Sequence, residues 1–146
     1  MAQDQPLRRR HTFPQGFRLK RKRLIRPLFD RGRKDVGTAT AGCIRLLYRL
    51  ADPVDAGVAV PLQIGFTTGR GVKRAVDRNR LKRYMRESFR LNQHLLLDLM
   101  ASRPDKMLTV MVIFRGNLET AGQQIPRAIP TAFSSLAVKI QEGSMP

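Results

Sequence analysis

Alternating hydrophobic and polar positions predict two β-strands in the first half of the chain. One spans residues 43–50. The other spans residues 62–68 and follows Pro61, which suits the start or the edge of a strand. The two faces of the first strand are formed by Ile44, Leu46 and Tyr48 and by Cys43, Arg45 and Leu47. A third segment, residues 107–114, is almost entirely apolar, so it predicts a strand buried on both faces at the centre of a sheet.

Hydrophobic residues recur at helical spacing in three further segments. The longest runs from about Ala75 to Met100 and collects its apolar residues on one side of a helical wheel. A short helix is predicted within residues 18–34, where Pro27 either lies in the first turn or kinks the helix. Residues 118–140 carry a third apolar stripe, and the prolines within it favour a helix that begins close to Pro130.

This order of elements predicts an α+β fold. We expect a two-layer sandwich in the order αβββαβα, with one central sheet of about four strands and helices packed on it. A chain of 146 residues is most simply one domain, which we place at residues 17–140. Residues 1–16 are predicted to form a mobile basic tail, and residues 141–146 a frayed C-terminal tail.

Positive charge then sets this sequence apart from an ordinary α+β domain. The chain has 28 Lys and Arg against 11 Asp and Glu, a formal net charge of +17. A basic chain with clustered charge is typical of nucleic-acid binding, with an anionic membrane surface as the second interpretation and solubility alone as the third. No apolar window is long enough to span a membrane, and no secretory signal is visible. We therefore expect a cytoplasmic protein without a membrane partner.

The helix predicted at residues 75–100 carries much of this charge on the side opposite its apolar stripe. An i, i+4 ladder is formed by Arg74, Arg78, Lys82, Arg86 and Arg90. Like charges at this spacing destabilise an isolated helix by roughly 0.2–0.5 kcal/mol per pair. Phosphates remove that repulsion and release counterions, so the ladder favours RNA or DNA contact. The predicted contact residues are Arg70, Lys73, Arg74, Arg78, Asn79, Arg80, Lys82, Arg83, Arg86 and Arg90.

The sequence shows no pattern typical of a protein active site. Cys43 is the only cysteine, and its apolar neighbours favour a small buried hydrophobe over a nucleophile. Acidic residues are few, and none is paired in a pattern suited to two metal ions. We therefore expect no catalytic residue, no cofactor or metal bound by the chain itself, and no small-molecule substrate.

The residues from the second predicted strand into the basic helix resemble a known family. Gly65-Phe66-Thr67-Thr68, Arg78-Asn79-Arg80 and Lys82-Arg83 look like the signature of the bacterial ribonuclease P protein component. Weaker similarity extends over about residues 18–115. The chain departs from the family pattern at Lys73-Arg74, where the family usually has Gly-Asn.

What the resemblance implies is a subunit that binds a catalytic RNA and helps it remove the 5′ leader from precursor transfer RNA. Cleavage would belong to the RNA and its Mg²⁺, and the fold would contain a left-handed βαβ crossover, against the usual right-handed rule. The Arg-Asn-Arg helix would face the catalytic RNA, and the leader would run between the sheet and the N-terminal helix. The implied leader residues are Arg18, Ile25, Phe29, Phe66 and either Leu47 or Tyr48, since the strand register is open by one residue.

Two other functions remain open at this point. A ribosomal or other structural RNA-binding protein could share the fold without any part in catalysis. A protein nuclease could cleave RNA without an RNA subunit. Cleavage of precursor transfer RNA at low Mg²⁺, measured with and without the partner RNA, separates the three functions.

Overall fold

The chain folds around a four-stranded sheet, and the computed structural model describes residues 13–57 and 59–143. In chain order the elements are η1 (Gln15–Phe17), α2 (Lys22–Ile25), η2 (Arg26–Phe29), β1 (Gly37–Ala41), β2 (Ile44–Ala51), α3 (Pro53–Ala56), β3 (Leu62–Thr68), α4 (Ala75–Asn92), α5 (His94–Ala101), β4 (Met107–Phe114), η3 (Leu118–Thr120) and α6 (Ala121–Gln141). Of the two predicted tails, residues 1–12 and 144–146 lie outside the described residues. Phe13, placed in the predicted basic tail, instead packs with its ring centroid 5.2 Å from that of Phe89.

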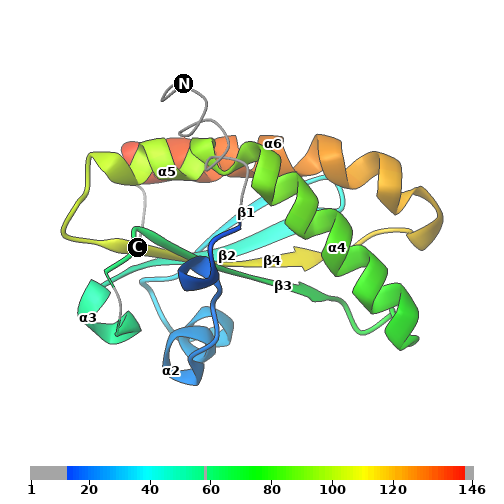
Figure 1. The fold of residues 1–146 in the computed structure, drawn as a ribbon, viewed down its shortest axis with the longest axis horizontal. Helices are drawn as coiled ribbons and strands as arrows, with labels where there is room; N and C mark the ends of the chain where they lie inside the picture. Colours follow the sequence, from blue (N-terminus) through cyan, green and yellow to red (C-terminus); the bar gives the residue numbers. More distant parts are fainter. Residues whose placement is uncertain (1–12, 58, 144–146) are drawn as a thin grey trace, which may run out of the picture.

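The strand order in the sheet is β1-β2-β4-β3, in which only β3 and β4 run parallel. β4 lies between β2 and β3 and is buried along almost its whole length, which confirms the central strand predicted at residues 107–114. β3 coincides with the strand predicted at residues 62–68. α4 and α5 connect β3 to β4 (Figure 1), and the left-handed sense of that crossover stays a prediction.

β1 is the strand for which the sequence showed no hydrophobic pattern, because Gly-Thr-Ala-Thr-Ala contains no large apolar residue. Its register sets Gly37 opposite Tyr48 in β2. A Cβ at Gly37 would lie 2.5 Å from a ring carbon of Tyr48, so this pairing requires glycine. β2 begins at Ile44 rather than at the predicted Cys43, because Cys43 belongs to the turn after Gly42, whose φ of 53° favours glycine.

Replacing Gly37 by alanine should lower the free energy of unfolding by about 1–3 kcal/mol, because the added methyl group overpacks the buried Tyr48 ring. Urea denaturation followed by circular dichroism measures the change. Gly71→Ala is the matched control, since a Cβ there meets nothing within 4 Å. Equal destabilisation by both substitutions would mean that the loss comes from backbone flexibility and not from Tyr48.

The single long helix predicted from about Ala75 to Met100 is wrong at Gln93, where α4 and α5 meet. Gln93 is only 2% exposed, and its Nε2 donates to the backbone carbonyl of Arg90 at 3.2 Å. The change of direction lays α5 alongside α6, as Figure 1 shows, and the apolar residues of α5 enter the core there. Tertiary packing therefore decides the position of the break.

α6 begins at Ala121, so the predicted start close to Pro130 is wrong. Pro126 and Pro130 both lie inside the helix, where each removes a backbone donor. The stripe beside them is completely buried, with Ile125 and Ile129 as examples. Full burial of one large aliphatic side chain contributes roughly 1.5–3 kcal/mol, so several of them offset the cost of both prolines.

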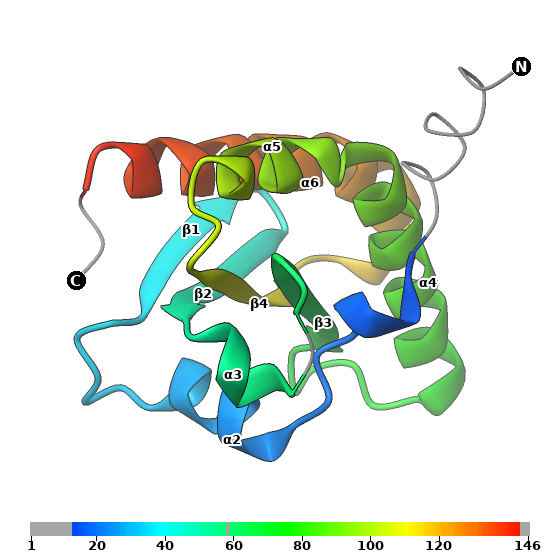
Figure 2. The same ribbon diagram turned by 60° about the vertical axis from the view of Figure 1, so that its left-hand side comes forward.

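Helices cover the two faces of the sheet unequally (Figure 1, Figure 2). α4, α5 and α6 pack on one face and enclose the main core, which includes Tyr48 and Phe133. α2 and η2 lie on the other face over a smaller cluster that includes Leu28 and Leu47. Pro27 is the second residue of η2, which follows α2 directly, so the N-terminal helix changes from α to 3-10 geometry at this proline. The predicted α+β class is confirmed, and among the described helices none is long and apolar enough to cross a membrane.

Candidate nucleic-acid interface

The basic helix α4 is held in place by the turn that follows β3. The Gly69 amide donates to the carbonyl of Phe114 at 3.0 Å, and the Val72 amide donates to the carbonyl of Gly69 at 3.2 Å. Arg78, in the first turn of α4, donates from Nη1 to the carbonyl of Lys73 at 2.6 Å and to that of Val72 at 3.3 Å. Arg78 therefore fixes the turn from within the helix, a role that the sequence did not indicate.

This turn is built without a residue in the left-handed region. Among the described residues, φ is positive only at Gly42, Gly57 and Gly143. Lys73 and Arg74 consequently adopt conformations open to any L residue, although they stand where the resembled family usually has Gly-Asn. Both side chains are exposed, so each places a cation beside α4.

Arg78→Ala should lower the free energy of unfolding by about 1 kcal/mol, because the variant cannot form the hydrogen bonds to the two turn carbonyls. Hydrogen exchange at the Val72 and Lys73 amides should also quicken, since the turn loses its anchor. Arg80→Ala serves as the control because the Arg80 side chain is exposed and forms no hydrogen bond within the described residues. The same exchange rates in both variants would show that Arg78 does not hold the turn.

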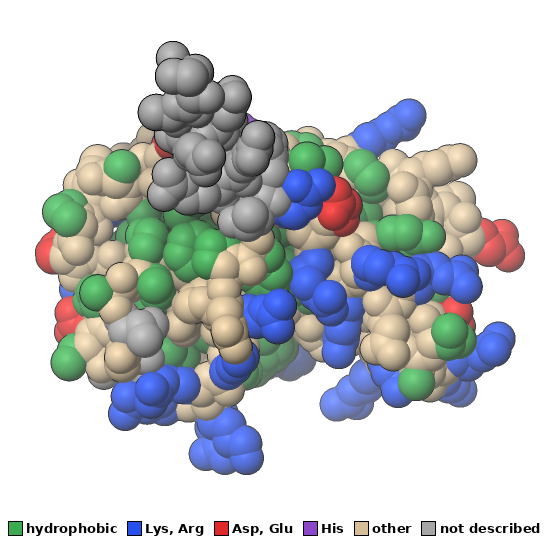
Figure 3. Space-filling view, in the orientation of Figure 1, with side chains coloured by type: hydrophobic (Ala, Val, Ile, Leu, Met, Phe, Trp, Pro, Cys, Tyr) green, Lys and Arg blue, Asp and Glu red, His purple; other side chains and the backbone are tan. Residues whose placement is uncertain are grey.

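The two sides of α4 differ as the helical wheel predicts. Leu81, Met85 and Phe89 are at most 1% exposed and face the main core. The opposite side and the preceding turn carry the exposed Arg70, Lys73, Arg74, Asn79, Arg80, Arg83 and Arg86, with Lys82 half-buried beside them. Figure 3 shows Lys and Arg side chains gathered over this part of the molecule and, separately, over the N-terminal segment. We call the α4 surface the basic face.

Acidic side chains compensate little of the charge on the basic face. Glu87 binds Arg90, with Arg90 Nε donating to Glu87 Oε1 at 3.2 Å. The hydrogen bond lowers the pKa of Glu87 and raises the pKa of Arg90. Within the described residues, no ion pair involves Arg80, Arg83 or Arg86. Arg80, Arg83 and Arg86 are therefore the arginines of the basic face that are best placed to bind phosphates.

A cavity lies on the other face of the sheet, where the resemblance placed the leader. It has a volume of about 470 Å³ and separates η2 from β1, β2 and β4, and we call it the sheet cavity. The residues that matter for its chemistry are Phe29, Arg31, Arg33, Thr38, Arg45 and Leu47. Phe29 is 50% exposed, whereas Leu47 is 7% exposed. The structure thus brings together two of the predicted leader residues, Phe29 and Leu47.

Two other predicted leader residues lie on the opposite face. Tyr48 is 2% exposed within the main core, and its pKa is raised by that burial. Phe66 packs edge-to-face on Phe89, with ring centroids 6.2 Å apart. Successive side chains of a strand point to opposite faces, so Leu47 facing the sheet cavity turns Tyr48 toward the helices. Leu47 lines the sheet cavity, whereas Tyr48 and Phe66 lie on the helix-covered face, so neither of these two lines the cavity as predicted. The alignment of residues 47 and 48 with the family's aromatic position stays a prediction.

Neither Ile25 nor Arg18 lines the sheet cavity. Ile25 is half-buried against the smaller apolar cluster under α2. Arg18 forms an isolated parallel bridge to Ile64 in β3, and its guanidinium carbon lies 5.4 Å from the centre of the Phe13 ring.

Three arginines of the sheet cavity were not predicted: Arg31, Arg33 and Arg45. The strand alternation gave a usable signal for Arg45, because it shares a face with Leu47. Arg33 is already engaged, donating from Nε and Nη2 to the two Asp35 oxygens at 2.8 Å each. That hydrogen bonding lowers the pKa of Asp35, so the pair stays ionised near neutral pH. Arg31 and Arg45 are the cavity cations most available to a ligand.

The remaining candidate groups are the metal-ligating side chains and the Cys43 thiol. Across residues 13–57 and 59–143, no three or more His, Cys, Asp or Glu side chains gather where they could hold a metal ion. Cys43 is 4% exposed, and burial raises the pKa of its thiol. A protonated, buried thiol is a poor nucleophile. The chemistry that these surfaces support is the binding of phosphates and unpaired bases.

The fold and the two surfaces define the class of the protein. It is a small α+β protein with a basic helix on one side of its sheet and, on the other side, a cavity with an exposed aromatic ring. This arrangement is suited to RNA binding. A family model described as Ribonuclease P matches residues 13–136. The chain therefore belongs to the ribonuclease P protein family. It is accordingly an RNA-binding protein of transfer RNA processing and a subunit of a ribonuclease P ribonucleoprotein.

Individual relatives agree with this assignment. The ribonuclease P protein component of Chlorobaculum tepidum is 30% identical, over 93% of this chain and 92% of the relative. That of Porphyromonas gingivalis is 40% identical over 41% of this chain and 42% of its own length. A solved structure of the Staphylococcus aureus RNase P protein has a TM-score of 0.51 at 18% identity, covering 80% of this chain and 91% of that one, which shows a shared fold.

Proposed function

We propose that this protein binds the catalytic RNA of ribonuclease P through the basic face and the 5′ leader of precursor transfer RNA through the sheet cavity. In this way it assists the endonucleolytic removal of the leader. One observation carries the proposal beyond family membership: the basic face and the sheet cavity lie on different sides of the same sheet. Two RNA segments can therefore be bound at once without competing for the same side chains.

Binding of the catalytic RNA would rest on phosphate contacts. Arginine presents a planar fork of donors that matches a phosphate, and each contact releases condensed counterions. Arg80, Arg83 and Arg86 are exposed on one helix, with Asn79 beside them to donate to a sugar or to a base edge. A rigid helix keeps these donors in a fixed spacing, so a folded RNA of matching shape is favoured over a flexible strand.

The sheet cavity is suited to an unpaired strand. Phe29 offers an exposed ring on which a base can stack, and the apolar Leu47 lines the cavity beside it. Arg31 and Arg45 can neutralise the neighbouring phosphates. Stacking accepts any base, so the protein would tolerate leaders of many sequences.

Cleavage itself would belong to the RNA subunit and its Mg²⁺. The part of this chain would be to hold the leader beside the catalytic RNA and to screen repulsion between the phosphates of the two RNAs. That screening lowers the concentration of Mg²⁺ at which the holoenzyme works.

A cleavage assay tests the proposal directly. The protein is added to a ribonuclease P RNA and a labelled precursor transfer RNA at low Mg²⁺, and the released leader is measured. We expect strong stimulation over the RNA alone and no cleavage by the protein alone. Lack of stimulation would favour a structural RNA-binding protein. Cleavage without the RNA subunit, abolished by one acidic substitution, would favour a protein nuclease.

A further inference from the structure

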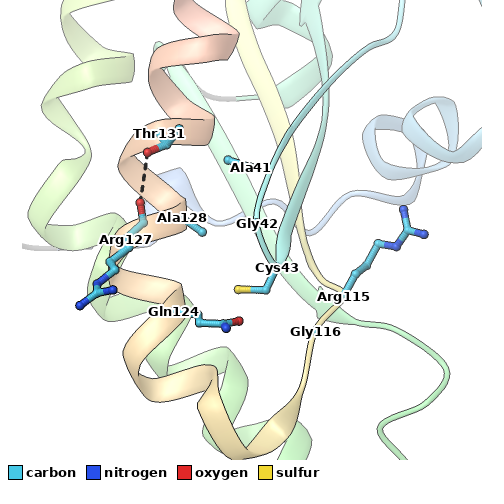
Figure 4. A pocket seen from close by; sticks show the side chains of 9 residues that line it. All are labelled: Ala41, Gly42, Cys43, Arg115, Gly116, Gln124, Arg127, Ala128 and Thr131. Carbon is cyan, nitrogen blue, oxygen red and sulfur yellow. Dashed lines mark hydrogen bonds between the residues drawn. The ribbon is translucent and has the colours of Figure 1, made fainter.

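We propose that the pocket between the β1–β2 turn and α6 binds one unpaired nucleotide of an RNA strand. We call it the hairpin pocket. Its principal lining residues are Gly42, Cys43, Gly116, Gln124, Arg127 and Ala128 (Figure 4). The inference rests on the proposed function in one respect, that the ligand of this protein is RNA. It adds a contact surface distinct from both the basic face and the sheet cavity.

Small residues create the pocket. Gly42 turns the hairpin with a positive φ of 53°. A Cβ at Gly116 would lie 2.6 Å from the Cβ of Cys43, so only glycine lets the chain after β4 approach this turn. Ala128 closes the side toward α6 with a single methyl group. The resulting volume of about 450 Å³ falls in the range of ligand pockets, about 300–1,000 Å³.

The polar groups of the pocket suit a base edge. Figure 4 shows the side chains of Cys43 and Gln124 turned toward each other across the pocket. The amide of Gln124 both donates and accepts, as hydrogen bonding to a base edge requires. The thiol of Cys43 is neutral because burial raises its pKa, so it does not repel an approaching polyanion.

The charges at the rim suit the phosphates that flank an inserted base. Arg115 and Arg127 stand on opposite sides of the pocket, and Figure 4 shows both guanidinium groups directed outward. Within the described residues neither guanidinium group takes part in an ion pair or a side-chain hydrogen bond. An apolar floor between two uncompensated arginines matches a nucleotide within a strand, whose base enters while its 5′ and 3′ phosphates remain at the surface.

The hairpin pocket adjoins the turn that leads into α4. Arg115 and Gly116 also border a second hollow of about 820 Å³, whose other side is formed by Gly69 and Gly71. Those glycines belong to the turn that leads into α4. A strand leaving the hairpin pocket can follow this hollow, which Glu119 also lines, toward the turn before α4. This path favours the catalytic RNA over a free nucleotide or an acidic protein as the occupant.

Filling the pocket tests the proposal. Gln124→Trp places an indole over the pocket, and Gln123→Trp places the same group on the exposed neighbouring residue outside it. We expect Gln124→Trp to weaken binding of the ribonuclease P RNA about tenfold and Gln123→Trp to leave binding unchanged. Arg127→Ala should make the salt dependence of binding shallower by about one unit. Unchanged binding by Gln124→Trp and Arg127→Ala would overturn the proposal.

The only cysteine of the chain gives an independent measurement. We expect methyl methanethiosulfonate to modify Cys43 slowly in the free protein, and more slowly still in Gln124→Trp and in the complex with ribonuclease P RNA. A rate that is the same with and without the RNA would contradict the proposal. Equal protection by millimolar nucleoside monophosphates would reassign the pocket to a small nucleotide, and protection by an acidic peptide alone would reassign it to a protein.

A variant of the basic face separates this inference from the proposed function. If the combined Arg80→Ala, Arg83→Ala, Arg86→Ala variant binds the RNA poorly while Gln124→Trp binds normally, only the hairpin pocket is excluded. If neither variant changes RNA binding, the proposed function fails as well.

Discussion

Replacing Arg80, Arg83 and Arg86 together by alanine should weaken binding of the catalytic RNA by on the order of 10- to 100-fold near physiological salt. These side chains are exposed, and no ion pair within the described residues involves them. Each arginine that no longer neutralises a phosphate should also reduce the slope of log K against log salt by about 0.7–0.9, so the slope of the triple variant should fall by roughly two to three units. Filter binding over a series of salt concentrations on both sides of the physiological value measures both effects.

Arg90→Ala is the matched control for this triple variant. Arg90 lies on the same helix but is already hydrogen-bonded to Glu87, so its removal should cost the RNA complex much less. The free protein should keep its stability in the triple variant, since all three side chains point away from the core. A weaker complex with an unchanged salt slope would contradict the assignment of these arginines to phosphates.

Phe29→Ala should weaken binding of precursor transfer RNA by about 5- to 150-fold if, as we propose, a leader base stacks on its exposed ring in the sheet cavity. Binding of mature transfer RNA, which has no leader, should hardly change. The ratio of the two dissociation constants in the reconstituted holoenzyme is the quantity to measure. A series of substrates with progressively shortened leaders should then locate the nucleotide that stacks on Phe29. Once the leader is too short to contain that nucleotide, the variant and the parent protein should bind the substrate equally.

Val138→Ala is the appropriate control for Phe29→Ala, because Val138 is exposed to a similar extent, 47% against 50%, but lies on α6. This substitution should leave precursor binding unchanged. Equal losses on precursor and mature transfer RNA by Phe29→Ala would mean that the sheet cavity does not hold the leader.

Local pattern was sufficient for the elements that bury a regular stripe. The strand at residues 62–68 and the central strand at residues 107–114 were located correctly, because their sequences alternate between apolar and polar residues or are apolar throughout. The expected order αβββαβα included a further strand before the basic helix, but β1 was not located, because its place in the sheet depends on a glycine accommodating the ring of Tyr48. The start of α6 was misplaced because packing in the core compensates for the two prolines inside the helix. The helix propensities of the local sequence do not include that packing energy.

The candidate binding surfaces were also predicted only in part from the sequence. The basic face could be predicted, since a helical wheel separates Leu81 and Met85 from the arginines. The role of Arg78 in the turn before α4 could not, because it depends on where two carbonyls lie in space. The resemblance assigned Tyr48 and Phe66 to the leader cleft. In the structure both side chains are on the helix-covered face of the sheet, where they pack in or against the main core. Arg45 could have been predicted as a cavity residue, because it lies two residues before Leu47 on the same face of the strand.

Cross-linking from two positions within one ternary complex tests the central claim that each side of the sheet binds its own RNA. Single cysteines are introduced by Arg83→Cys on the basic face or Phe29→Cys in the sheet cavity, each in a Cys43→Ala background, and each carries a short photoreactive group. The proposed function predicts that position 83 cross-links to the catalytic RNA and position 29 to the precursor leader. Cross-links from both positions to the same RNA would contradict this claim.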